Sequence, residues 1–187
     1  MSPVQNDNLG LPISRRRVFS PEECRQILAM PFPPGAPGRI HNPENDNVDE
    51  SVRKTTSYQV EPIPANRWIW ERIGPLFLDM NQRYFQFRLA KLSAFQVLEY
   101  GPGGFYDWHM DIGPDRHSCR KLSAVIFLSP REDYEGGRLL FSPGEGRIGQ
   151  DLGSAVIFPS YIVHRVEPVT RGQRFTLVCW ALGDAFI

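Results

Sequence analysis

The sequence contains few cysteines. Cys24, Cys119 and Cys179 are the only three in 187 residues, and they lie far apart without a C-x-x-C pair. An odd and scattered set of this kind argues against a disulfide framework and against a zinc site made of thiolates. We therefore expect three free thiols.

The sequence also lacks an excess of one charge and a long apolar run. Lysine plus arginine and aspartate plus glutamate both number 21, so the formal net charge is zero. This balance, without a basic stripe, argues against a nucleic-acid partner. No apolar run approaches the roughly 20 residues of a membrane-spanning helix, and the N-terminus lacks the apolar core of a signal peptide. We expect a cytoplasmic protein without a membrane partner.

The first half of the chain predicts helices and a long loop. We expect a loose tail over residues 1–13 and a short helix that Ser20 caps and that ends near Ala29. A second helix is predicted over residues 65–84 from its periodic apolar stripe. Between the helices, residues 31–50 are rich in proline, glycine and acids, which slightly favours a disordered surface loop. A lid over a binding site is the alternative.

From residue 91 onward, short apolar segments alternate with turns rich in glycine and proline, a pattern typical of strands. The predicted strands are residues 91–100, 105–111, 121–128, 138–141, 155–158, 162–168 and 174–181. We expect the last two to form a hairpin around Thr170-Arg171-Gly172. Helices followed by strands, in a chain long enough for one domain, predict a mainly β fold with supporting α-helices, built as a sandwich or a double-sheet jelly roll.

The segment YDWHMD carries the clearest chemical signal. In a strand, His109 and Asp111 lie on one face, and Trp108 and Met110 lie on the other, where we expect core residues. An imidazole and a carboxylate on one face suit a divalent metal, and His164 could supply a third ligand. Each residue alone is more typical of a core or surface position. Together, two histidines and one carboxylate leave coordination positions open, as in non-haem Fe(II) oxygenases.

The last predicted strand adds a candidate anion site. Alternation places Arg174, Thr176, Val178 and Trp180 on one face. If this face is the inner one, Arg174 is a fixed cation deep in the barrel and well separated from the metal. By itself, an arginine near a C-terminus is usually a surface charge. Trp180 is expected either to wall this pocket or to pack in the core.

Four segments make the chain recognisable: YGPGGFYDWHMD, RKLSAVIFLS, DYEGGRLLF and FPSYIVHRVEPVTRGQRFTLVCW. Over roughly residues 90–182 the chain resembles the 2-oxoglutarate and Fe(II)-dependent dioxygenases, specifically the prolyl 4-hydroxylase-like branch. The resemblance implies a double-stranded β-helix, a jelly-roll or cupin-like core, in residues 90–182. Residues 1–89 would support this core within a single domain that spans residues 1–187.

The resemblance also implies a role for each candidate site residue. His109, Asp111 and His164 would bind Fe(II), which makes them both the metal ligands and the catalytic residues. Three further residues would bind the distal carboxylate of 2-oxoglutarate, namely Arg174, Thr176 and Tyr100. Phe127 stands where some relatives have a second tyrosine for this carboxylate. Besides Fe(II), the cosubstrates would be 2-oxoglutarate and O2, with ascorbate as a stimulant.

The implied activity is that of an oxidoreductase, a hydroxylase of an unactivated C–H that releases succinate and CO2. Its substrate would be a peptide or protein side chain, with peptidyl proline as the default by analogy, or a small molecule such as an amino acid. A non-catalytic metal- or sugar-binding jelly roll is the alternative, although such a binder has no need for a buried cation opposite the metal. The sequence specifies neither the oligomeric state nor the substrate.

Basic residues in two regions are candidates for contacting a charged substrate. They are Arg53, Lys54, Arg120 and Lys121. For each one, a solvated strand edge is the commoner interpretation. Tyr106 and Asp107 are further candidates for the entrance of the site.

Overall fold

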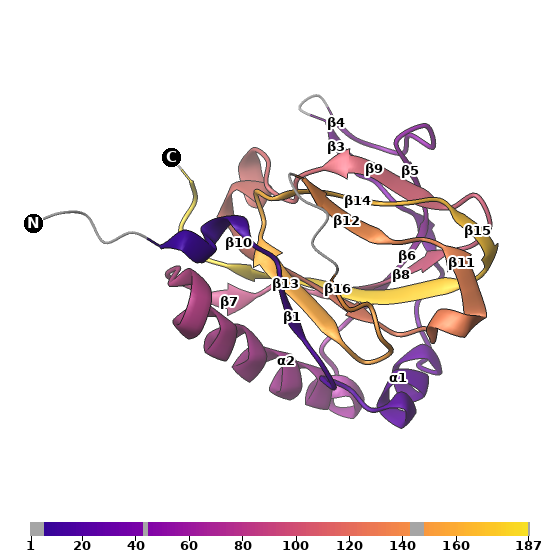
Figure 1. Cartoon of the computed structure of the whole chain (residues 1–187), viewed down its shortest axis with the longest axis horizontal. Helices are drawn as coiled ribbons and strands as arrows, with labels where there is room; N and C mark the ends of the chain where they lie inside the picture. The colour runs from indigo at the N-terminus through magenta and orange to yellow at the C-terminus, as the bar shows by residue number, and fades with distance from the viewer. Residues whose placement is uncertain (1–5, 43–44, 143–147, 187) are drawn as a thin grey trace, which may run out of the picture.

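The computed structural model describes residues 6–42, 45–142 and 148–186. Two facing β-sheets form the body of the molecule, and helix α2 lies beneath the larger sheet (Figure 1). The larger sheet has the strand order β1 (Ile13–Arg15), β13 (Ala155–Pro159), β10 (Arg120–Phe127), β16 (Arg174–Leu182), β8 (Phe95–Tyr100), β6 (Thr56–Val60) and β2 (Ala36–Pro37), with β7 (Lys91–Leu92) paired to β16.

The smaller sheet lies above the larger one in Figure 1. Its strand order is β12 (Leu139–Ser142), β14 (Val163–Val166), β9 (Phe105–His109) and β5 (Arg53–Lys54). Two further antiparallel pairs complete the strands of the described residues: β11 (Tyr134–Gly136) with β15 (Val169–Gly172), and β3 (Ile40–Asn42) with β4 (Asn45–Asn47). The architecture is mainly β with supporting helices, as predicted.

Helix α1 (Pro21–Leu28) begins where the sequence predicts it. The Glu23 backbone N–H donates to the Ser20 hydroxyl, and the Ser20 backbone N–H donates to the Glu23 carboxylate at 2.8 Å. This reciprocal capping satisfies backbone donors that the first helical turn leaves free.

The predicted helix of residues 65–84 is divided in the structure. Its α-helical part is α2 (Arg67–Met80), and a single turn of another helix type continues it at each end. These turns are η2 (Pro64–Asn66) and η3 (Asn81–Phe85). One stripe of α2 is buried, with Ile69, Ile73, Phe77 and Met80 in contact with the core. Three other short turns are η1 (Asp7–Gly10), η4 (Asp115–Cys119) and η5 (Arg131–Asp133). None of the described helices combines the length and the apolar composition needed to cross a membrane.

The larger sheet separates two environments. From β10, the side chains of Leu122, Ala124 and Ile126 join the apolar core that includes α2. The alternate residues Val125 and Phe127 join a second cluster between the sheets. The same alternation along β16 places Leu177, Cys179 and Ala181 toward the helices, and Arg174, Thr176, Val178 and Trp180 toward a cavity between the sheets. The face of Arg174 is thus the inner one, which is the condition that the sequence analysis set for a buried cation.

The predicted hairpin of residues 162–168 and 174–181 is wrong. Strand β14 pairs with β12 and β9 in the smaller sheet, whereas β16 pairs with β10, β8 and β7 in the larger one. The residues between them form β15, which pairs with β11. Turn residues between two strands show where the chain bends, but they do not show whether it returns to the same sheet.

Two segments that were predicted to be irregular contain strands. Where it is described, the predicted N-terminal tail contains η1 and begins β1, which pairs with β13. The Asn6 side chain donates to the Tyr84 carbonyl at 3.0 Å. Residues 1–5 lie outside the described residues. In the loop of residues 31–50, β2 pairs with β6 and β3 pairs with β4, so the disordered-loop interpretation is wrong for these paired segments. Backbone pairing, which composition does not show, orders both segments.

Candidate active site

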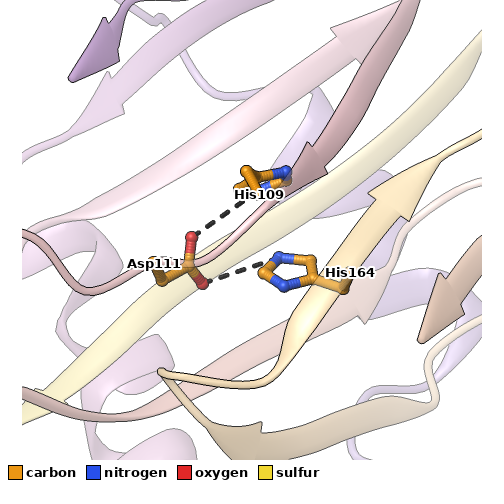
Figure 2. Close-up of side chains that lie close together, drawn as sticks. All are labelled: His109, Asp111 and His164. Carbon is orange, nitrogen blue, oxygen red and sulfur yellow. Dashed lines mark ion pairs between the residues drawn. The ribbon is translucent and has the colours of Figure 1, made fainter. Parts of the chain in front are cut away.

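The two histidines of the site lie directly opposite each other on paired strands. His109 ends β9, and its antiparallel partner residue on β14 is His164. Asp111 follows two residues after His109, and its backbone N–H donates to the Ser160 carbonyl at 2.9 Å. The chain thus carries the carboxylate from the end of β9 toward both imidazoles, and Figure 2 shows the three side chains converging.

One ligand atom from each of these three side chains lies within 4.8 Å of the others. His109 Nε2 is 3.8 Å from Asp111 Oδ1, and His164 Nε2 is 3.8 Å from Asp111 Oδ2. These atoms surround a space of the size that one metal ion needs. Two imidazole nitrogens and one carboxylate oxygen form the donor set that suits Fe(II) with open coordination positions.

Backbone carbonyls fix the tautomer of each histidine. His109 Nδ1 donates to the Asp107 carbonyl at 2.7 Å, and His164 Nδ1 donates to the Ile162 carbonyl at 2.9 Å. A carbonyl only accepts hydrogen bonds, so each Nδ1 carries the proton and each Nε2 keeps its lone pair for a metal.

The pKa values of His109 and Asp111 also favour metal binding. Burial lowers the pKa of His109, and the neighbouring His164 lowers it further. Burial alone would raise the pKa of the Asp111 carboxyl, but the neighbouring imidazoles, Arg120 and the hydrogen bond from Ser123 together lower it. A neutral His109 and an ionised Asp111 are the protonation states that bind metal.

Two buried serines contact Asp111, Ser123 at its carboxylate and Ser160 at its backbone N–H. Ser123 Oγ donates to Asp111 Oδ2 at 2.6 Å, and the Ser123 and Ser160 hydroxyls lie 3.0 Å apart. The sequence analysis missed both serines. Ser123 carried a weak signal, since it is a hydroxyl residue within an apolar strand, whereas Ser160 follows β13 in a turn and carried none.

Arg174 is buried without an ion-pair partner among the described residues. Its side chain is only 1% exposed, and Nε, Nη1 and Nη2 make no hydrogen bond within the described part of the chain. The Tyr100 and Phe127 rings lie 5.1 and 5.6 Å from its guanidinium carbon. Burial lowers the pKa of Arg174. An unpaired buried ion costs on the order of several kcal/mol, so this site fits an anionic ligand that accepts from the guanidinium.

One cavity of about 830 Å³ joins the histidine pair to Arg174. All six residues predicted for the site line it, namely Tyr100, His109, Asp111, His164, Arg174 and Thr176. Pro33, Pro34 and Pro37 from the proline-rich loop line it as well. A cavity of this size is typical of small-molecule sites.

The sequence analysis also missed Tyr134. Its hydroxyl is buried beside Arg174, where it favours the charged guanidinium, although no well-formed hydrogen bond joins it to the described residues. Tyr134 lies in a Gly-rich segment that the sequence predicts to be a turn, and only the pairing of β11 with β15 brings it to the site. The structure therefore provides a second tyrosine near Arg174, although Phe127 occupies the position expected from the family resemblance.

Trp108 and Met110 are not core residues, contrary to the prediction. They are 43% and 49% exposed. Trp108 lies 4.7 Å from the guanidinium carbon of Arg165. Alternation correctly places Trp108 away from the metal ligands, but both α-helices pack on the larger sheet and leave the outer face of the smaller sheet uncovered.

Comparison with known proteins places the chain in a family. Residues 95–182 match the 2OG-Fe(II) oxygenase superfamily. A PKHD-type hydroxylase from Alteromonas mediterranea is 44% identical over 171 residues, which cover 83% of this chain and 70% of that protein. Across four such relatives, the chain spans between 57% and 70% of their length.

Two solved structures share the fold. A prolyl-4-hydroxylase from Pseudomonas putida superposes with a TM-score of 0.70 at 23% identity, covering 92% of both chains. A prolyl hydroxylase from Trichoplax adhaerens, solved with a peptide fragment of a hypoxia inducible factor, gives 0.72 at 17% identity and covers 94% of this chain and 84% of that one. The predicted fold class, a double-stranded β-helix with supporting helices, is confirmed.

The fold and the convergent donor set define an oxidoreductase of the iron-dependent oxygenase class. The chain belongs to the 2OG-Fe(II) oxygenase superfamily. Members of this superfamily use Fe(II), 2-oxoglutarate and O2, as the sequence analysis predicted.

Proposed function

We propose that this chain hydroxylates an unactivated C–H of a prolyl peptide or an amino acid, coupled to conversion of 2-oxoglutarate to succinate and CO2. His109, Asp111 and His164 would hold the iron. Iron(II) bound there supplies the redox chemistry that activates O2. The names of the Alteromonas and Pseudomonas relatives, a hydroxylase and a prolyl-4-hydroxylase, support this reaction.

The guanidinium of Arg174, buried without an ion pair to any described residue, is the single observation that carries the proposal. Arg174 would donate two parallel N–H groups to the distal carboxylate of 2-oxoglutarate, a pairing that the planar guanidinium favours. Tyr100 and Thr176 line the same cavity and would add hydroxyl donors. A protein that only bound a metal or a sugar would have no use for this costly buried cation.

The remaining residues prepare the site for metal binding. The carbonyls of Asp107 and Ile162 orient the two imidazoles, and Ser123 orients the carboxylate of Asp111. The ring of Tyr106 stacks on His109, with ring centroids 3.4 Å apart. Ligands that are held in place before the metal arrives bind it at a smaller entropic cost.

Anaerobic titration tests the proposal directly. Addition of 2-oxoglutarate to the Fe(II) protein should produce a weak charge-transfer band in the visible spectrum, and admission of O2 should release succinate. Absence of the band, together with no succinate from any substrate, would overturn the proposal. A succinate-release screen over prolyl peptides, free amino acids and cell extract would then identify the substrate, and the same assay tests whether ascorbate stimulates turnover.

A further inference from the structure

Four arginines line the cavity in addition to Arg174. Arg39 and Arg116 have exposed side chains, whereas Arg53 and Arg120 are partly buried. Arg53 comes from β5 of the smaller sheet, and Arg120 begins β10 of the larger one. Their sequence neighbours Lys54 and Lys121 do not line this cavity, and Lys121 Nζ lies against the Phe186 ring instead. Arg53 and Arg120 therefore face the site from opposite sheets. Arg53 lies on the edge strand β5, in keeping with the solvated-edge interpretation, whereas Arg120 begins the inner strand β10.

Each of these arginines lies against an aromatic ring of the cavity. The Arg120 guanidinium carbon is 3.8 Å from the centroid of Trp180, and the Arg53 guanidinium carbon is 4.6 Å from that of Tyr106. Since Tyr106 stacks on His109, the Arg53 guanidinium is separated from a proposed iron ligand by one ring. Stacking of this kind holds a guanidinium in place while its N–H edge stays available to a ligand.

Among the described residues, only backbone carbonyls accept the hydrogen bonds that Arg53 and Arg120 make. Arg120 Nη1 donates to the Asp111 carbonyl at 3.0 Å, and Arg53 Nη1 donates to the Arg39 carbonyl at 2.9 Å. Neither arginine forms an ion pair with a described residue. Arg53 Nε and Trp180 Nε1 are buried donors that find no acceptor within the described ranges. A bound ligand would therefore have to bring the acceptors.

The charges of the loaded site leave both arginines uncompensated. The charges of iron(II) and the 2-oxoglutarate dianion cancel, and so do those of Asp111 and Arg174. Asp111 is the only acidic residue among the described residues that line the cavity. Arg53 and Arg120, together with the exposed Arg39 and Arg116, thus keep an excess of positive charge at the part of the cavity that remains for the primary substrate.

From this arrangement we infer that the primary substrate carries a carboxylate close to the C–H that is hydroxylated, and that Arg53 and Arg120 recognise it. The carboxylate belongs either to an acidic side chain beside the target residue of a peptide or to the α-carboxylate of a free amino acid. This inference rests on the proposed function and narrows its substrate class.

Calorimetry with matched ligands tests the inference without turnover. The protein is loaded with 2-oxoglutarate and with Mn(II) in place of Fe(II), so that no turnover occurs. It is then titrated with acetylated, amidated pentapeptides that have a central proline. One peptide has glutamate on both sides of the proline, its twin has glutamine, and a third has lysine. The amino-acid arm compares L-proline with L-prolinamide.

An acid-bearing ligand should bind about tenfold more tightly than its neutral twin, because one well-placed charge pair contributes about 1.4 kcal/mol or more. The lysine peptide should bind weakest. In Arg53→Gln and Arg120→Gln the preference for the acid should shrink severalfold. Lys54→Gln is the matched control, because it removes a neighbouring charge that lies outside the cavity, and it should keep the full preference.

Three results would overturn the inference. The first is that no acid-bearing ligand binds more tightly than its neutral twin. A complete lack of binding by the peptides and the amino acids counts as this result. The second is a preference for acids that persists in both arginine variants while their affinity for 2-oxoglutarate falls, because the arginines would then serve the cosubstrate. The third is that a short oligodeoxynucleotide binds more tightly than the acidic peptide. The charge-transfer titration separates these results from failure of the proposed function, since the band forms in all three cases if that function holds.

Discussion

The two faces of the larger sheet are built from the same strands but have different roles, since one packs against the helices and the other lines the cavity. The face toward α1 and α2 is apolar, with Ile126, Ile157 and Leu177 fully buried against the helices. The face toward the smaller sheet holds Arg174 and Ser123, equally buried but polar. Because adjacent side chains of a strand alternate between faces, one sheet both stabilises the fold and builds the site.

This difference separates the residues that stabilise the protein from those that prepare it for ligands. Apolar burial lowers the free energy of the folded state at the helical face. At the cavity face, a cation and several donors are left without acceptors, which costs stability until an anion binds. Substitutions on the two faces should therefore have opposite effects, and the following predictions test this contrast.

Asp111→Ala should have the largest effect on the cavity face. The substitution removes the only carboxylate of the donor set, so iron binding and 2-oxoglutarate turnover should both be lost. Iron content after anaerobic reconstitution and succinate release measure the two effects. Normal turnover in this variant would contradict the assignment of Asp111 as a ligand.

Arg174→Met should separate activity from stability. Loss of charge-assisted hydrogen bonds of about 3 kcal/mol in total should raise the KM for 2-oxoglutarate roughly 100-fold or more. In the protein without ligand, removal of an unpaired buried charge should increase the free energy of unfolding, because methionine fills similar space without that cost. Urea denaturation and steady-state kinetics measure the two effects. A less stable protein with an unchanged KM would contradict the role given to Arg174.

Ile157→Ala makes the matched change on the helical face. Its side chain is fully buried against the helices, so truncation should lower the free energy of unfolding by about 2–5 kcal/mol. At a temperature where the variant is folded, its KM for 2-oxoglutarate should stay close to that of the unmodified protein. A large change in KM without a change in stability would show that the two faces are not separate in function.

Ser123→Ala should have a smaller effect, confined to the metal. Without the hydroxyl that holds Asp111 Oδ2, iron affinity should fall by roughly 10- to 100-fold, the usual cost of losing a partner of a metal ligand. Turnover at saturating iron should recover most of its rate. Competition with a chelator measures the affinity, and Ser123→Thr, which keeps the hydroxyl, should rescue it.

The smallest expected difference between the two faces is in the reactivity of the cysteines. All three cysteines are free, as predicted; Cys24 and Cys179 are buried, whereas Cys119 is partly exposed. Burial raises the pKa of the Cys24 thiol to about 11 and also raises that of Cys179. A chromogenic disulfide reagent at pH 8 should label one thiol in the folded protein and three in urea. If all three thiols of the folded protein reacted at one rate, the reagent would have access to the core at the helical face, which would contradict this prediction.

The sequence was sufficient to predict the residues whose signal is local. His109 and Asp111 stand two residues apart, alternation along one strand places Arg174 and Thr176 together, and the capping signal at Ser20 marks the start of α1. The resemblance to a family supplied what local patterns do not, namely the role proposed for Tyr100 and the identity of the cosubstrate.

The remaining features depend on which strands pair and on what covers each sheet. Ser160 and Tyr134 reach the site only through the pairing of distant strands, and the crossing from β14 to β16 between sheets has no signature in its turn residues. Trp108 shows the second limit, because alternation predicts which way a side chain points but not whether another layer covers it.

A crystal structure of the anaerobic complex with Fe(II) and 2-oxoglutarate, with data collected at the iron absorption edge, tests the central claim most directly. The account predicts one anomalous peak bound by His109 Nε2, His164 Nε2 and Asp111, with the distal carboxylate of 2-oxoglutarate paired to the guanidinium of Arg174. An iron peak elsewhere, or a guanidinium still unpaired in the presence of bound 2-oxoglutarate, would contradict it.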